Sequence, residues 1–253
     1  MKIIISPAKK MEVHNDFLEA KGLPVFLNET KELMLEIQKL SYDGAKLMWK
    51  CNDSLAQLNF ERFKKMDLHK NLTPALLTYE GLQYQYMGAD LLSYRQLDYL
   101  QENLRILSGF YGILKPFDGV VPYRLEMQAR INLPNKVNTL YKFWGDKLYQ
   151  ELIKDEKSPE IILNLASKEY SKAIEPFLSG HESFVTCTFA SLAKDGKLKV
   201  KATEAKIARG QMVRFMAENS IMDLEEVKVF TGRNFHYQKE LSDEKNLVFV
   251  QQD

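Results

Sequence analysis

The stretch Ile161-Ile162-Leu163-Asn164-Leu165, which Ala166-Ser167 ends, tells most about the fold of this chain. An apolar run of this length predicts a buried strand. Ile3-Ile4-Ile5, stopped by Ser6-Pro7, predicts a second buried strand in the same way. Ser167 stands where a helix N-cap is expected, so we predict a helix from there to about Ile174. Strands and helices therefore both belong to this fold.

The segments on either side of these strands add helices first and mostly strands later. Between about Glu29 and Leu107, apolar residues recur at steps of three and four, which predicts mainly helices; one stripe is Leu97, Leu100, Leu104 and Leu107. A short helix is expected over 144–153. The last third predicts strands over 184–189, 198–201, 227–237 and 247–250, with one helix over about 203–219.

This order of elements predicts the fold class. Because the strands do not alternate cleanly with helices, we expect an α+β fold, with a mixed sheet and surrounding helices, rather than a doubly wound sheet. We expect one domain over residues 1–253.

Composition narrows the class of protein without naming a partner. The formal net charge is +1, and the hydrophobic share of 45% is ordinary for a globular chain. Because no apolar stretch approaches the length of a membrane span, we expect a soluble, cytoplasmic protein without membrane contact, and we favour a monomer. The four histidines lack ligand spacing, so we predict no metal site and no cofactor.

The distribution of charge is more informative than its sum. Seven basic residues lie between Lys194 and Arg214, and a second basic group extends from Arg105 to Lys147. In a strand, Lys197, Lys199 and Lys201 would share one face at intervals of about 6.6 Å, close to the spacing of successive phosphates. Two such surfaces could form a basic cleft that binds DNA. The pattern alone favours a more ordinary interpretation, in which lysines protect an edge strand from aggregation.

The segment Leu104–Pro116 contains a possible phosphate contact. A predicted helix, the bend Gly109-x-x-Gly112 and a further apolar segment resemble a helix-hairpin-helix. In such hairpins, backbone N–H groups at glycine approach a phosphate. The usual hairpin has Gly-x-Gly and Pro116 would shorten the second helix, so the segment on its own favours a structural turn.

Polar residues next to apolar runs suggest a pocket. Charged groups at the ends of buried strands often line a site, although caps and ion pairs explain them equally well. If they converge, carboxylates and a lysine could act as general acid, base or nucleophile of an enzyme that acts on a nucleobase or nucleotide. The candidates are Glu80, Arg124, Glu126, Asn164, Ser167, Glu169, Tyr170 and Lys206.

Several short blocks follow one another along the chain: Ile5–Lys10, Tyr79-Glu80-Gly81, Leu104–Pro116 with Asp118, Pro122–Met127, Tyr141–Gly145, Asn164–Ser167 with Glu169-Tyr170, and Lys206 with Ala208–Met212. In this order they resemble the YaaA peroxide stress resistance protein family nearly end to end. The resemblance implies a cytoplasmic protein that limits free intracellular iron during hydrogen peroxide stress. It also implies an unusual α+β fold with a basic cleft, a helix-hairpin-helix-like element, and binding to double-stranded or branched DNA.

Together, these observations predict a DNA-binding protein of the peroxide response that protects DNA, with an indirect effect on iron. The alternative is the enzyme described above, acting in a polar pocket of the same cleft. The residues expected to contact DNA are Lys9, Lys10, Arg105, Ser108, Gly109, Gly112, Lys115, Arg124, Lys142, Lys197, Lys199, Lys201, Lys206 and Arg209.

Overall fold

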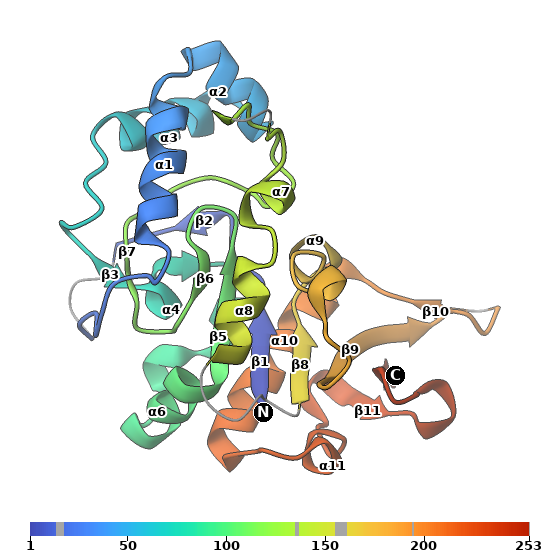
Figure 1. The fold of residues 1–253 in the computed structure, drawn as a ribbon. Coiled ribbons are helices and arrows are strands. Elements are labelled where there is room, and N and C mark those ends of the chain that lie inside the picture. The colour runs from blue at the N-terminus through green and yellow to red at the C-terminus, as the bar shows by residue number, and fades with distance from the viewer. Residues whose placement is uncertain (14–17, 135–136, 155–160, 194, 253) are drawn as a thin grey trace.

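A mixed sheet forms the centre of the molecule in a computed structural model that describes residues 1–13, 18–134, 137–154, 161–193 and 195–252. Along the sheet the strands follow the order β11-β12-β9-β8-β1-β5-β6, and β10 pairs with β9 (Figure 1). Their bounds are β1 (Lys2–Ile5), β5 (Leu104–Ser108), β6 (Gly112–Leu114), β8 (Ile161–Leu165), β9 (Ser183–Leu192), β10 (Leu198–Lys199), β11 (Phe235–Tyr237) and β12 (Asn246–Gln251).

The two strands predicted first lie side by side at the centre. β1 and β8 are parallel, with Ile4 opposite Asn164 and Ile5 opposite Leu165. On its other side β1 pairs in parallel with β5, and β8, β9 and β12 continue the parallel region. Only the pairings with β6, β10 and β11 are antiparallel. Parallel strands are covered on both faces, which explains why Ile3–Ile5 is a continuous, fully buried apolar run.

Helices pack around this sheet, as the sequence predicted for an α+β protein. In Figure 1, α1 to α3 gather at one end of the molecule, α8 crosses in front of the sheet and α10 lies behind it. The bounds are α1 (Leu27–Gln38), α2 (Tyr42–Trp49), α3 (Asp53–Lys64), α4 (Ala75–Thr78), α5 (Leu82–Met87), α6 (Tyr94–Asn103), α7 (Leu140–Trp144), α8 (Lys147–Lys154), α9 (Lys168–Ser171), α10 (Ala202–Asn219) and α11 (Leu224–Val227).

Two small antiparallel strand pairs complete the described sheets. β2 (Lys10–Met11) pairs with β4 (Tyr79–Glu80), so Lys10 stands opposite Glu80. β3 (Thr73–Pro74) pairs with β7 (Gly119–Val120). The first of these pairs brings the segment after β1 beside the segment that precedes α5.

The prediction of a helix-hairpin-helix-like element at Leu104–Pro116 is wrong. Helix α6 ends at Asn103, and β5 and β6 form an antiparallel hairpin in which Ile106 faces Leu114. Leucines at steps of three and four predicted a helix through Leu107, but the segment is buried on all sides, and in such a segment periodicity no longer separates helix from strand. Pairing with β1 satisfies the backbone groups of β5 and decides in favour of the strand.

Two further predictions need correction in the last third of the chain. Residues 227–237 are not one strand, because α11 reaches Val227 and only Phe235–Tyr237 is extended. β10 holds two residues, and Lys201 already precedes α10, so the three lysines from Lys197 do not share one long strand face. The helix over about 203–219 and the strands beginning near 184 and 247 are confirmed.

Candidate functional site

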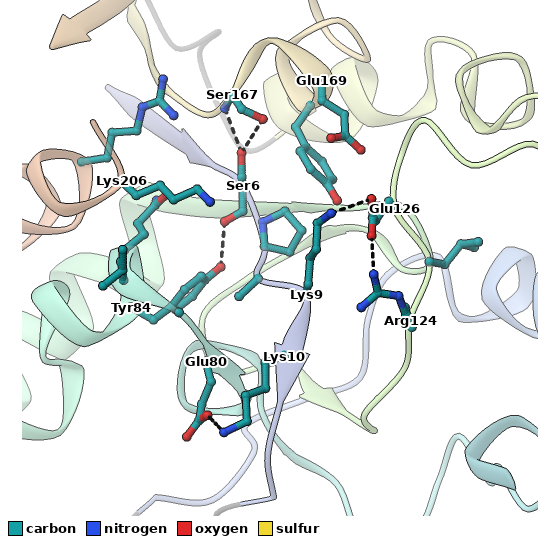
Figure 2. Close-up of a pocket in the computed structure, with 18 of the residues that line it drawn as sticks. Ser6, Lys9, Lys10, Glu80, Tyr84, Arg124, Glu126, Ser167, Glu169 and Lys206 are labelled. Carbon is teal, nitrogen blue, oxygen red and sulfur yellow. Dashed lines mark hydrogen bonds and ion pairs between the residues drawn. The ribbon is translucent and has the colours of Figure 1, made fainter. Parts of the chain in front are cut away.

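A pocket of about 380 Å³ lies at the carboxyl ends of β1 and β8. Ligand sites of parallel sheets commonly occur at this edge, because several strands end there and release polar chain segments together. Five segments line the pocket: 6–10 after β1, 80–84 around the start of α5, 123–126, 167–170 after β8, and Lys206 with Arg209 on α10. Figure 2 shows their side chains pointing toward one another from these separate elements.

Two serines join the ends of β1 and β8 within the pocket. The Ser167 backbone N–H donates to Ser6 Oγ over 2.8 Å, and Ser6 Oγ in turn donates to Ser167 Oγ over 3.2 Å (Figure 2). The Tyr84 hydroxyl donates to the Ser6 carbonyl over 2.9 Å. Ser167 occupies the predicted N-cap position of α9, but its side chain does not cap that helix. It faces the pocket instead.

Asn164 supports this edge of the sheet from behind the pocket. Its Oδ1 accepts from the Ala166 N–H over 2.9 Å, and its Nδ2 donates to Thr186 Oγ1 over 3.1 Å. Asn164 is absent from the residues that line the pocket. We conclude that it shapes the turn that leads to Ser167.

Ion pairs neutralise the cations on two sides of the pocket. Glu126 binds both Lys9, at 3.1 Å, and Arg124, at 3.0 Å. Lys10 pairs with Glu80 at 2.5 Å and with Glu12 at 2.6 Å, and these two carboxylates raise its pKa. The cations that follow β1 therefore already have anionic partners.

The pKa of Glu169, a carboxyl in the pocket wall, is raised from its ordinary value. Burial raises its pKa, and the nearby charge of Glu126 raises it further, although a hydrogen bond of 3.2 Å from the Gln128 N–H opposes this shift. A carboxyl group in such surroundings can give or take a proton closer to neutral pH than an exposed one.

The buried Tyr123 lines the pocket, and hydrogen bonds hold its hydroxyl in place. The hydroxyl of Tyr123 lies 2.8 Å from that of Tyr79 and 2.6 Å from Ser108 Oγ. Burial raises the pKa of Tyr123 to about 12, so this phenol stays protonated at neutral pH. The network fixes the position of the wall that continues to Arg124.

The structure brings together most of the predicted site. Seven of the eight candidate catalytic residues line the pocket, and only Asn164 stands outside it. Among the residues expected to contact DNA, the pocket holds Lys9, Lys10, Arg124, Lys206 and Arg209.

The other predicted DNA contacts are dispersed. Arg105 and Lys115 line a second cavity of about 420 Å³, where the buried Arg105 donates to the carbonyls of Gln101, Glu102 and Leu104. Lys142 is exposed on α7, and Lys197, Lys199 and Lys201 are exposed around β10. A single basic cleft that unites all of them stays a prediction.

Ser108, Gly109 and Gly112 do not offer a phosphate site, which corrects their predicted role. Ser108 is fully buried. A Cβ on Gly109 would lie 2.5 Å from the Leu125 carbonyl oxygen, and one on Gly112 would lie 2.9 Å from the Trp144 ring. These glycines allow close packing of the hairpin inside the protein, and no phosphate can reach them there.

Sequence reasoning missed several residues of the pocket wall. Ser6 was interpreted as the end of a strand, and Gln83, Tyr84 and Tyr123 were not predicted. The signal for Ser6 was its position directly after an apolar run, the same signal that identified Ser167. The residues of the short α5 had no comparable signal.

No group of three or more His, Cys, Asp and Glu side chains in the described ranges is placed to hold a metal ion. Within the same ranges, no helix combines the length and the apolar character that crossing a membrane requires.

Fold and site together define an α+β protein with a charged pocket, of small-ligand size, at one edge of a mixed sheet. The family model for the peroxide stress protein YaaA matches residues 1–241, and the chain belongs to this family. Membership supports a role in peroxide stress and confirms the resemblance found in the sequence.

Similar chains occur in several bacteria. The chain is 51% identical over 253 residues to a UPF0246 protein of Pediococcus pentosaceus, covering 100% of this chain and 99% of the relative. It is 51% identical to a UPF0246 protein of Lactiplantibacillus plantarum, with full coverage of both chains. A UPF0246 protein of Lachnoclostridium phytofermentans is 52% identical over 250 residues, covering 99% of this chain and 96% of the relative.

Proposed function

We propose that this peroxide-stress protein binds double-stranded or branched DNA and takes one nucleotide of it into the pocket. The observation that carries the proposal is the convergence of five cationic and three acidic side chains on one cavity of about 380 Å³. Cations in a concave site attract phosphates, and carboxylates beside them can read or react with a base. Bound DNA would be shielded from oxidative damage.

The size of the cavity decides which part of DNA can enter. Pockets of roughly 300–1,000 Å³ hold small molecules, and a nucleotide is of this class, whereas a duplex is not. A nucleotide leaves a duplex at a cost of a few kcal/mol, and at a lower cost where pairing is already disturbed. Branched DNA supplies such positions, so we expect it to bind more tightly than an intact duplex.

Charge reversal at the pocket tests DNA binding. We expect the double variant Lys206→Glu/Arg209→Glu to weaken binding of duplex and of branched DNA at least about tenfold, because lost phosphate contacts cannot be replaced, and to flatten the salt dependence. Fluorescence anisotropy titrations at two salt concentrations measure both effects.

The matched control reverses two exposed lysines at the C-terminal end of α3, as Lys64→Glu/Lys65→Glu, and should bind within about twofold of the wild type. A triple variant with Lys197, Lys199 and Lys201 changed to Glu measures the contribution of the β10 region. Wild-type affinity in the pocket variant would refute the proposal.

The effect on iron belongs to the same proposal as an indirect one. In this proposal the protein acts on DNA or nucleotides, and the fall in unincorporated iron follows from that action. Less free iron would then produce less hydroxyl radical at the DNA, which links both parts to peroxide resistance.

The second candidate is an enzyme that acts on a nucleobase or nucleotide. Glu169 favours this candidate, because burial and the nearby Glu126 raise its pKa. The pocket also holds the hydroxyls of Ser6 and Ser167. General acid–base catalysis by one positioned group contributes about 10²–10⁴-fold to a rate.

Mass spectrometry of nucleotides and branched DNA incubated with the protein tests catalysis. We expect a new product from the wild type and a rate lower by at least about 100-fold in Glu169→Gln, because an amide cannot transfer the proton. The wild-type rate should fall as pH rises through the raised pKa if Glu169 acts as an acid. Lack of any product from the wild type would remove the enzyme candidate and leave DNA binding standing.

A further inference from the structure

The walls of the pocket differ in whether their cations contact a carboxylate. On the side of β1 and 123–126, Lys9, Lys10 and Arg124 each contact a carboxylate. On the α10 side, neither the Lys206 nor the Arg209 side chain makes a hydrogen bond or an ion pair within the described part of the chain. Positive charge is therefore uncompensated along one wall only.

Arg209 carries this charge under unfavourable conditions. Burial lowers its pKa, and its Nε is buried without an acceptor among the described residues. A guanidinium stays charged in proteins, and withdrawing its charge from water without a partner costs free energy. An anion that entered the pocket would supply the missing partner and recover this cost.

Gln83 adds a second unpaired donor beside Arg209. Its side chain lines the pocket at 6% exposure, and its Nε2 has no acceptor in the described structure. Buried amide donors are normally hydrogen-bonded, so an isolated one in a pocket wall indicates a ligand acceptor. Gln83 and Arg209 are held together because Gly210 brings α10 against the Gln83 backbone.

Lys206, near the N-terminal end of α10, completes this wall. It lies three residues before Arg209 and so shares the same face of the helix. Figure 2 shows its side chain reaching into the pocket on the side of Ser6. One flexible ammonium group and one half-buried guanidinium make a suitable pair for a tetrahedral oxyanion, which offers several acceptor atoms.

We infer that Lys206, Arg209 and Gln83 form a phosphate subsite, which fixes the direction in which a nucleotide enters the pocket. This inference rests on the proposed function and deepens it. The phosphate lies against α10, and the sugar and base extend toward the paired wall of Glu126 and Glu169. Ligands that carry a phosphate monoester or diester are thereby selected over neutral nucleosides.

Calorimetric titration of the full chain with adenosine 5′-monophosphate and with adenosine tests the subsite. We expect the wild type to bind the nucleotide at least about tenfold more tightly than the nucleoside, because charge-assisted contacts to phosphate add to base binding. Lys206→Gln and Arg209→Gln should each remove most of this preference while changing adenosine affinity less than about twofold.

The matched control is Arg214→Gln, which removes a cation from the same helix that already pairs with Glu218 at 2.7 Å. It should keep the full preference for the nucleotide, and thermal unfolding of each variant shows that it is folded. Equal affinity of the wild type for both ligands would overturn the subsite and leave the pocket as a nucleoside site. A preference that survives both α10 variants would overturn it as well. If neither ligand binds the wild type and DNA does not bind either, the proposed function fails together with the subsite.

Discussion

Gly210→Ala should destabilise the protein by roughly 3 kcal/mol or more, because overpacking against a fixed backbone leaves no side chain to move aside. An added Cβ would lie 2.1 Å from the Gln83 carbonyl oxygen and 2.9 Å from its carbonyl carbon. Gly210 lies inside α10, where the intrinsic helix propensity of alanine would stabilise the protein by about 1 kcal/mol. The sign of the measured change in the free energy of unfolding therefore decides between local propensity and tertiary contact.

Chemical denaturation of Gly210→Ala and of a control measures this difference. Gly22→Ala is the control, since a Cβ there meets no heavy atom within 4 Å and the stability should change by less than about 0.5 kcal/mol. The α10 variant should also lose ligand binding, because Arg209 and Gln83 no longer stand together. Higher stability for Gly210→Ala would show that α5 and α10 are not packed as described.

The close approach of α10 to α5 illustrates which parts of the site a sequence can predict. The helix itself follows from its pattern, and its observed bounds, Ala202–Asn219, agree with the expected ones. The sequence alone did not show the role of Gly210 within this helix. A glycine that allows two helices to pack closely and a glycine that merely weakens a helix look the same in a single sequence. The role of Gly210 depends on a backbone more than 120 residues away in the chain, namely Gln83.

The central strands and the pocket edge were predictable for a common reason. Ile3–Ile5 and Ile161–Leu165 are short apolar runs ended by small polar residues, which is the pattern of a parallel strand that opens into a site. Ser167, Glu169 and Tyr170 were therefore identified from position alone. The partner of each charge was not predictable, since Glu126 binds Lys9 across more than 100 residues as well as its neighbour Arg124.

The hairpin after α6 shows where the same reasoning failed. Leucine spacing and two glycines at Gly109 and Gly112 suggested a DNA-binding bend, but spacing has no meaning in a segment that is buried all round. The two glycines predicted to contact a phosphate instead allow close packing inside the protein. This packing places 125–127, and with it Glu126, against the sheet.

Ser108→Ala should cost roughly 2–5 kcal/mol of stability, because it orphans buried donors that each cost about 1–3 kcal/mol when unpaired. Ser108 Oγ accepts from the N–H of Tyr111 at 2.9 Å and of Phe110 at 3.2 Å, and it also contacts the Tyr123 hydroxyl at 2.6 Å. Removing the hydroxyl leaves both backbone donors without this acceptor inside the core. Equilibrium urea unfolding measures the loss.

Ser171→Ala is the matched control, since that serine is equally buried but donates only to Glu175, whose carboxylate keeps Lys168 as a partner. It should lose less than half as much stability as Ser108→Ala. The two roles considered for Ser108 predict opposite results for this pair of measurements. If Ser108 contacts a phosphate, loss of its hydroxyl lowers DNA affinity and leaves stability unchanged. If Ser108 is an acceptor within the hairpin, the same loss lowers stability and affects DNA binding only by displacing Tyr123 in the pocket wall. Unchanged unfolding free energy with weakened DNA binding would therefore return Ser108 to the DNA interface and contradict its burial.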